Sequence, residues 1–173
     1  MNKGFTVLTH DWVTHVFLHS GKSFINSSGR VQIGDNCGFG EGVTILKGVS
    51  IGENCFIGAG SIVTHDIPAN SIAVGSPCHV VKSLDEYYMQ RLATSESEAL
   101  DYAKSIYERF HRLPTINEFK EEFIYFVSGD EIDDFPMLPI RQQLGPYLDQ
   151  YRLNHVAKYK TFEEFLKSAG IEI

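Results

Sequence analysis

A bulky apolar residue returns at every sixth position of this sequence between residues 31 and 68. A helix requires a period near 3.6 residues and an ordinary strand a period of two, so neither explains this spacing. A period of six residues is typical of a β-helix, in which each hexapeptide contributes one short strand and one turn. The members of the series are Ile33, Phe39, Ile45, Ile51, Ile57 and Val63.

Three hexapeptides are expected to close one triangular coil of eighteen residues, with the bulky apolar side chains inside. Glycine follows several of these side chains, as at Gly52 and Gly58, and it permits a close backbone approach that a Cβ would obstruct. The repeat predicts two full coils, over residues 33–50 and 51–68. Short antiparallel strands with glycine-rich turns are the alternative, but they do not account for six unbroken matches.

The segment before the repeat contains part of another coil and a long interruption. Residues 1–9 can be laid on the later stretch around GEGVTILKG so that Phe5 falls with Val43 and Val7 with Ile45. The chain is therefore expected to begin in the middle of a coil and to form about 2.5 coils in all. Residues 11–30 lack the repeat, and we interpret them as a loop inserted between two hexapeptides that projects from the stack. Long loops of this kind are often functional.

After the repeat, the composition changes toward that of helices. Pro68 and Pro77 interrupt regular structure, so the chain is expected to leave the coil there. About four helices are predicted, over residues 85–110, 115–126, 139–153 and 161–170. The sequence thus predicts two domains: a β-helix domain at 1–84, with its loop at 11–30, and a helical extension at 85–173. The first helix has a predicted buried face of Tyr88, Leu92, Leu100, Ala103, Ile106 and Phe110.

Composition excludes several classes of partner. The net charge is −7, without a basic stripe, which argues against binding to nucleic acid. The sequence lacks a signal-peptide pattern and an apolar run of eighteen residues, so we expect a cytoplasmic protein without membrane insertion. Its three cysteines do not form a disulfide framework. Cys37 and Cys55 lie one coil apart and are expected to stack as small apolar groups, whereas Cys78 has no evident partner.

The stretch IGDNCGFGEGVTILKGVSIGENCFIGAGSIVTHDIPANSIAVGSPCHVVK resembles the C-terminal coils of the hexapeptide-repeat acyltransferases. Among these it is similar to the coenzyme A-dependent O-acetyltransferases of sugars and surface polysaccharides, and TVLTHDW resembles their catalytic strand. The resemblance covers about residues 4–84. It implies a left-handed parallel β-helix, an exception to the usual right-handed crossover. It also implies a homotrimer with active sites between subunits, acetyl-CoA as co-substrate and a carbohydrate acceptor.

By the same resemblance, the catalytic histidine is His10. A sugar hydroxyl is a poor nucleophile until its proton is removed, and imidazole is suited to that role. Asp11, Trp12 and His15 are candidates for contact with the acceptor, with Trp12 offering an apolar face to a sugar ring. Adjacent residues of a strand point to opposite sides, so Asp11 is not expected to orient His10. A packed or solvated histidine remains the alternative for His10 and His15.

The resemblance assigns coenzyme A to two short segments, one within the last coil and one after it. Small residues there would let the pantetheine arm run along exposed backbone, and a lysine would meet a phosphate. This chain departs from the family pattern at three places. It has His65 where relatives often have lysine, the sequence SPCH at 76–79, and Gly38 where relatives commonly have tryptophan. The same small residues also suit plain coil corners. The candidates are Gly58, Ala59, Thr64, His65, Gly75, Ser76 and Lys82.

Two other functions are compatible with these residues. A truncated or inactive trimeric scaffold is suggested by the start in mid-coil and by the short stack. A zinc enzyme similar to the γ-class carbonic anhydrases is suggested by His10 and His15, which are five positions apart. His15 lies in the irregular loop and no third ligand is evident, so no metal is expected.

Overall fold

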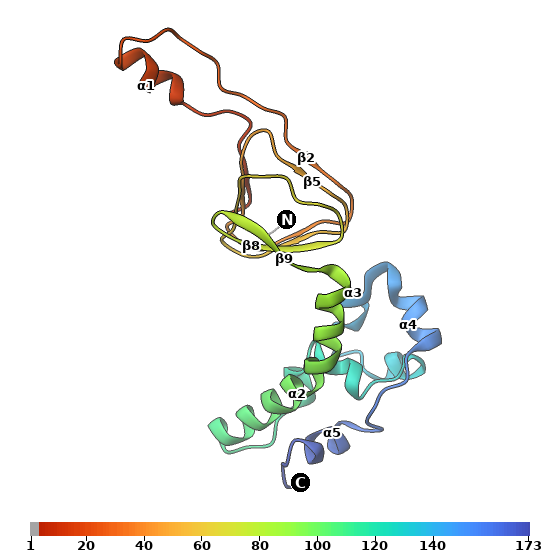
Figure 1. Cartoon of the computed structure of the whole chain (residues 1–173). Helices are drawn as coiled ribbons and strands as arrows, with labels where there is room; N and C mark the ends of the chain where they lie inside the picture. The colour runs from red at the N-terminus through yellow and green to blue at the C-terminus, as the bar shows by residue number, and fades with distance from the viewer. Residues whose placement is uncertain (1–3) are drawn as a thin grey trace. The chain divides into compact units, whose positions relative to one another are not determined.

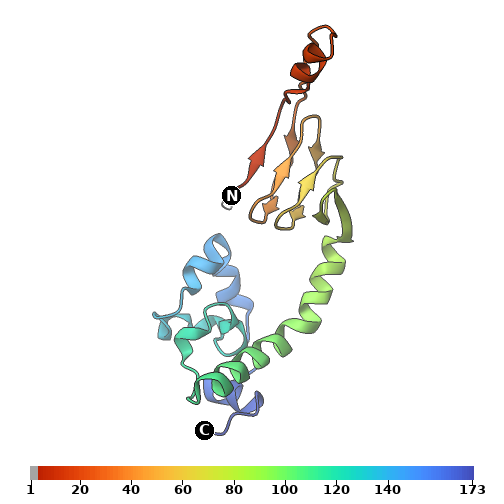
Figure 2. The same ribbon diagram turned by 90° about the vertical axis from the view of Figure 1, so that its left-hand side faces the viewer.

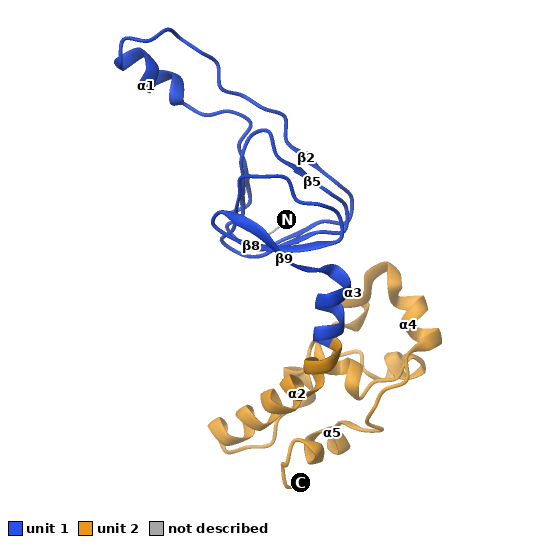
Figure 3. Cartoon of the chain, viewed as in Figure 1, with its two compact units in different colours: residues 1–91 blue, residues 92–173 orange. Residues whose placement is uncertain are grey.

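The computed structural model describes residues 4–173 and divides the chain into two compact units, residues 1–91 and 92–173 (Figure 3). The division falls inside one long helix, α2, which spans Leu84–Phe110. Each unit has a hydrophobic core of its own.

In the first unit, the chain winds through short parallel strands that stack in three sheets (Figures 1 and 2). Within the six-residue series, paired residues of β2 with β5, β3 with β6 and β4 with β7 are eighteen positions apart, as in Ile33 with Ile51 and Ile45 with Val63, which confirms the predicted length of a coil. The sheets have the strand orders β1-β4-β7, β2-β5 and β3-β6-β8-β9. The strands are β1 (Thr6–Val7), β2 (Gln32–Ile33), β3 (Gly38–Phe39), β4 (Thr44–Ile45), β5 (Ser50–Ile51), β6 (Phe56–Ile57), β7 (Ile62–Val63), β8 (Ser71–Gly75) and β9 (Cys78–Ser83).

The residues of the six-residue series fill the inside of the coil, with one exception. Ile45, Ile57 and Val63 are completely buried, and Phe39 and Ile51 are nearly so. Ile33 remains 41% exposed, so the prediction that it is enclosed is wrong. The reason is that β2 pairs with β5 alone and no described strand stacks on its other side. β3 is also the first strand of its sheet, but there the ring of Phe5 packs on Phe39, with the ring centroids 4.7 Å apart.

The insertion at residues 11–30 has the predicted place in the coil but contains its own helix. Val7 pairs with Ile45 and Thr6 with Thr44, so the alignment of the first segment with the repeat is confirmed. These partners are 38 positions apart, and the excess of twenty over one coil is the length of the insertion. The interruption is not entirely irregular, because α1 (Val13–His19) forms two turns within it. Figure 2 shows this inserted loop extending beyond the stacked strands.

The coil ends between the two prolines that predict its exit. Ile72 and Ala73 of β8 pair in parallel with Phe56 and Ile57, so the third sheet continues beyond Pro68, and the chain leaves the coil only before Pro77. The chain then reverses through Gly75, whose φ of +104° is a conformation that favours glycine. β9 returns antiparallel to β8 and gives the sheet its last strand.

Helix α2 confirms the predicted helix at 85–110, but its buried face is shorter than predicted. Ala103 and Ile106 are buried in the second unit, whereas Tyr88, Leu92 and Phe110 are more than half exposed. The core of the second unit contacts only the middle of α2, since its buried residues begin at Ala99. Among the described residues, the apolar side chains of the first turns belong to neither hydrophobic core.

The predicted second helix is replaced by two 3₁₀ turns. Thr115 and Glu118 form the predicted capping box, but it opens only η1 (Ile116–Glu118), followed by η2 (Glu122–Tyr125). Another capping box, between Ser128 and Glu131, opens η3 (Gly129–Asp134) in the stretch predicted as a connector. These boxes satisfy the backbone donors of a first turn, which is compatible with a turn that does not continue as an α-helix.

The predicted third helix is divided and the predicted fourth is confirmed. Helix α3 (Ile140–Leu144) ends before Gly145, which has a φ of +50° and is followed by a proline. These two residues begin η4 (Gly145–Tyr147), which precedes α4 (Leu148–Asn154). Helix α5 (Phe162–Ser168) begins after Thr161, whose Oγ1 accepts a hydrogen bond from the Glu164 N–H at 3.1 Å. Phe119, Phe126 and Phe165 form the aromatic centre of this unit. Among residues 4–173, no helix is long and apolar enough to cross a membrane.

Candidate active site

His10 lies where the first strand passes into the inserted loop, and its side chain is exposed. The two legs of the loop pair around it through backbone hydrogen bonds: Gly29 N–H donates to the Thr9 carbonyl at 2.9 Å, and Asp11 N–H donates to the Ser27 carbonyl at 3.1 Å. His10 itself forms an antiparallel bridge with Ser28. The backbone of the predicted catalytic residue is therefore held from both sides.

Asp11 is bound within the foot of the loop. Its carboxylate accepts hydrogen bonds from the Val13 N–H at 3.0 Å, from Ser27 Oγ at 2.9 Å and from Lys47 Nζ. The Lys47 ammonium first, and then the other two donors, lower the pKa of this carboxyl from 3.8 to about 2. The carboxylate of Asp11, a predicted acceptor-binding residue, is therefore engaged by the protein itself.

Two aromatic neighbours of His10 lie beside it at the start of α1. The Trp12 ring centroid is 6.3 Å from that of His10 and 5.1 Å from that of His15, so the indole lies within contact range of both imidazoles. Trp12 is 70% exposed, and His15 is exposed as well. The structure thus brings together His10, Trp12 and His15, which present polar ring atoms and an open indole face.

Four predicted coenzyme A residues lie at another corner of the coil. Gly58 packs against β8, where an added Cβ would lie 2.7 Å from a methyl carbon of Val74. Ser61 is completely buried and connects the two levels of this corner: its hydroxyl donates to the Gly58 carbonyl at 2.7 Å and accepts from the Gly75 N–H at 3.1 Å. Ala59 and Ser76 are exposed beside these glycines.

The remaining predicted cofactor residues lie elsewhere in the first unit. Thr64 Oγ1 and His65 Nδ1 are hydrogen-bonded at 2.7 Å, directly after β7. Gly58 and Ala59 precede β7, so the two groups occupy opposite ends of that strand. Lys82 is an exposed residue of β9, paired with Ile72. One chain therefore does not gather all the predicted cofactor residues at one corner.

Sequence reasoning missed two residues of this region, Lys47 and Ser61. The repeat itself contains the signal for Lys47, since it stands two places after Ile45 just as Thr9 stands two places after Val7. That alignment places Lys47 at the same corner as the entrance to the loop. Ser61 has no such signal, because a serine in a glycine-rich turn is ordinary and its burial depends on the strand above it.

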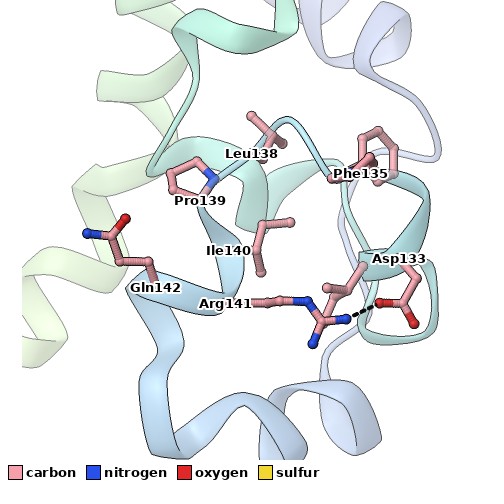
Figure 4. A pocket seen from close by; sticks show the side chains of 9 residues that line it. Asp133, Phe135, Leu138, Pro139, Ile140, Arg141 and Gln142 are labelled. Atoms are coloured by element: carbon pink, nitrogen blue, oxygen red, sulfur yellow. Dashed lines mark hydrogen bonds and ion pairs between the residues drawn. The ribbon is translucent and has the colours of Figure 1, made fainter.

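One hollow of the structure, of about 420 Å³, borders the candidate site at His15, where Val16, His19 and Ser20 also line it. Other hollows lie away from these residues. One of about 650 Å³ lies along the sheet of β2 and β5, lined by residues such as Gln32, Ser50 and Asp66. In the second unit, a hollow of about 300 Å³ is bordered by Leu138 and Ile140, beside Arg141. Figure 4 shows this hollow. Among residues 4–173, no three His, Cys, Asp or Glu side chains are grouped so that they could hold a metal ion.

The comparisons with known proteins concern the first unit. Residues 30–65 match the family model for the bacterial transferase hexapeptide (six repeats). The matched residues lie within the coil, so this part of the chain is similar to the hexapeptide repeat of bacterial transferases.

Among the relatives, a Staphylococcus aureus (strain COL) protein named "Putative acetyltransferase" is 48% identical over 82 residues, which are 47% of this chain and 39% of the relative. Escherichia coli (strain K12) galactoside O-acetyltransferase is 50% identical over 74 residues, 43% of this chain and 35% of the relative. The chain thus spans less than half the length of either relative.

Two solved structures are similar to part of the chain. A maltose O-acetyltransferase from Clostridium difficile 630 is 42% identical, with a TM-score of 0.40, over 46% of this chain and 41% of that one. A galactoside acetyltransferase in complex with coenzyme A is 40% identical, with a TM-score of 0.42, over 47% of this chain and 40% of that one.

Proposed function

We propose that this chain carries the catalytic portion of an acetyl-CoA-dependent O-acetyltransferase that acts on a hydroxyl of a sugar or of a surface-polysaccharide precursor. The observation that carries the proposal is the placement of His10, exposed at the point where a long loop interrupts the hexapeptide coil. The sequence similarity of the coil to acetyltransferase relatives supports the reaction class. The fold proposed with it is the left-handed form of the parallel β-helix.

In the proposed reaction, His10 acts as a general base. Its imidazole takes the proton from the acceptor hydroxyl, and the oxygen attacks the thioester carbonyl of acetyl-CoA. A tetrahedral oxyanion forms, which a backbone N–H donor stabilises. Its collapse breaks the carbon–sulfur bond, and the departing thiolate recovers the proton from the imidazolium. The acetyl group passes directly to the acceptor, so no covalent enzyme intermediate is required.

The acceptor is proposed to lie at the foot of the inserted loop. Trp12 offers an exposed indole face against which the apolar face of a sugar ring can stack, and His15 lies within contact range of the same indole. Asp11 is less suited to bind the acceptor directly, because its carboxylate already accepts three hydrogen bonds from the protein.

Coenzyme A is proposed to bind along the coil corners that present Gly58, Ala59, Gly75 and Ser76, with Thr64, His65 and Lys82 as further contacts. These residues are divided between the two ends of β7 and the last strand. A complete site is therefore proposed to form between two copies of the chain in a homotrimer, with the cofactor corner of one copy facing His10 of the next.

The proposal is tested by measuring acetyl transfer from acetyl-CoA to a panel of sugars with the wild-type chain and a His10→Asn variant. Removal of the general base is expected to lower kcat/KM by roughly 10²–10⁴-fold. His111→Asn is the matched control, because His111 lies in the second unit and its φ of +52° is one that asparagine tolerates. Full activity in His10→Asn would contradict the mechanism.

Binding of coenzyme A distinguishes the proposed enzyme from an inactive scaffold. If the chain is the proposed enzyme, titration calorimetry should detect coenzyme A binding to the wild-type chain and to His10→Asn alike, since His10 is not among the proposed cofactor contacts. If neither protein binds coenzyme A under conditions in which it is folded, the scaffold alternative accounts for the chain better than the enzyme.

A further inference from the structure

Three segments distant in the sequence meet at the foot of the inserted loop. The outgoing leg, at residues 9–11, and the return leg, at residues 27–29, are joined by two backbone hydrogen bonds. The third segment is the turn after β4, which contains Lys47 and Gly48 and belongs to the next coil. The loop is thus attached to the body of the coil at one small region.

Lys47 connects both legs through its ammonium group. Its Nζ donates to Asp11 Oδ2 on the outgoing leg and to Ser27 Oγ on the return leg. Ser27 Oγ in turn donates to Asp11 Oδ2 at 2.9 Å, so the three polar groups form a closed triangle. A charge-assisted arrangement of this kind restricts each partner more than a single exposed ion pair does.

Close backbone packing brings the return leg onto the same turn. A Cβ at Gly29 would lie 2.8 Å from Gly48 N and 3.1 Å from Gly48 Cα, so the two glycines are in direct backbone contact. Gly48 directly follows Lys47 in the sequence. The backbone contact of Gly29 and the hydrogen bond to Ser27 therefore attach the return leg to two neighbouring residues of the same turn. The loop foot is thereby fixed in two ways, by packing and by charge.

We propose that Lys47 is a positioning residue, which through Asp11 and Ser27 sets the place of His10 and of the loop residues Trp12 and His15. The inference rests on the proposed function of His10. His10 lies between Thr9 and Asp11, both of which bond to the return leg, so loosening this foot moves the base itself. Small displacements of a reacting group reduce its effectiveness because the bound geometry no longer matches the transition state.

The test compares Lys47→Met with Lys47→Arg, and uses Lys22→Met as a matched control that removes an exposed charge from the same loop. Hydrogen exchange of the Asp11 and Gly29 amides reports the loop foot independently of activity. Exchange in Lys47→Met is expected to be about fivefold faster than in the wild type, as for loss of an exposed ion-pair network. It should be unchanged in Lys22→Met and largely restored in Lys47→Arg.

Activity and cofactor binding are measured on the same proteins. The proposal expects kcat for acetyl transfer to fall about tenfold in Lys47→Met, while the Kd for coenzyme A measured by calorimetry is unchanged. A merely structural role would not separate these two quantities. Asp11→Asn should reproduce the effect, and the double variant should be no worse than either single one, since all three break the same triangle.

Two results would overturn the positioning role while leaving the proposed function intact: unchanged exchange in Lys47→Met, or faster exchange with an unchanged kcat. A wild-type chain that binds coenzyme A but acetylates no sugar overturns the proposed function, and the positioning role with it. Hydrogen exchange therefore tests the positioning role of Lys47, whereas calorimetry together with the acetylation assay of the wild-type chain tests the proposed function.

Discussion

Gly29 and Gly48 are packed backbone against backbone: a Cβ on Gly29 would lie 2.8 Å from the nitrogen of Gly48. This contact joins the return leg of the inserted loop to the turn after β4, beside the polar triangle of Lys47, Asp11 and Ser27. A side chain cannot be added to Gly29 without moving the backbone of this contact. The position of His10, the proposed catalytic residue, therefore depends on a tightly packed region of backbone.

Replacement of Gly29 by alanine is expected to displace the return leg, because the atoms in its way are backbone and cannot rotate aside. We expect a loss of roughly 1–3 kcal/mol in the free energy of unfolding of the first unit and faster amide exchange at Asp11. Gly38→Ala is the control, since its new Cβ would meet the side chain of Phe56, which is 43% exposed, and no backbone atom. Equal losses in both variants would contradict this account.

The foot of the loop is expected to loosen in acid. The pKa of Asp11 is lowered to about 2, so its ionised form favours the folded loop, and this contribution is present above about pH 4. It is lost as pH falls from about 4 toward 2 and the carboxylate is protonated in the folded state. Trp12 is the single tryptophan of the chain and adjoins Asp11, so its fluorescence reports the change.

Asp11→Asn supplies the control for the acid transition, because an amide does not titrate. The fluorescence change between about pH 4 and pH 2 should be absent in this variant. A transition of equal size in both proteins would assign the change to another group.

The bulky apolar residue of the repeat is expected to contribute different amounts to the free energy of unfolding in different coils. Ile57 is completely buried, and Ile57→Ala is expected to cost roughly 2–4 kcal/mol, through lost burial and the cavity that remains. Ile33 occupies the same place in its hexapeptide but is 41% exposed, so Ile33→Ala should cost less than about 1 kcal/mol. Denaturant unfolding followed by Trp12 fluorescence measures both. Comparable losses would mean that Ile33 is covered in solution.

Glu118 is expected to support the start of η1 in the second unit. Its carboxylate accepts two hydrogen bonds from the Arg112 guanidinium, at 2.7 and 2.9 Å, and one from the Thr115 N–H at 2.8 Å. Arg112 first, and then Thr115, lower the pKa of Glu118 from 4.5 to about 2. Glu118→Gln should therefore reduce stability by about 1 kcal/mol at neutral pH, as for loss of a capping interaction.

The contribution of Glu118 depends on pH with a defined sign. Because its pKa is lowered in the folded protein, the stabilisation is present above about pH 4.5 and is lost as pH falls toward 2. The difference between the wild type and Glu118→Gln should shrink over this range. Glu121→Gln, at an exposed residue whose side chain makes no capping hydrogen bond, should leave stability unchanged across it.

The position of the candidate site in the coil could be predicted because the repeat shows which residues of successive coils are aligned. Once Val7 is aligned with Ile45, the interruption at 11–30 has a defined position, and His10 stands at its entrance. The pairing of Asp11 with Lys47 was within reach of the same alignment. The participation of Ser27 from the return leg was not, because nothing in the loop sequence gives the pairing of its two legs.

Local signals were less reliable in the second unit. The capping box of Thr115 and Glu118 forms, yet the helix it was expected to begin does not continue, because a cap satisfies the first turn and does not fix the conformation of the residues after that turn. Gly145 interrupts the next predicted helix through its positive φ. The exposed Tyr88 and Leu92 show that an apolar stripe does not say where along a helix the core ends.

The sequence by itself determined the coil of this protein, because a bulky residue at every sixth place fits neither the 3.6-residue period of a helix nor the two-residue period of a strand. Tertiary structure decided what no period encodes: which residue of the series lies at an open end, as Ile33 does, and which groups close the foot of the loop. The physical reason is that periodicity reports the direction of each side chain relative to its own strand. Burial and charge pairing depend on what the rest of the chain places opposite, as Lys47 is placed opposite Asp11 from 36 residues away.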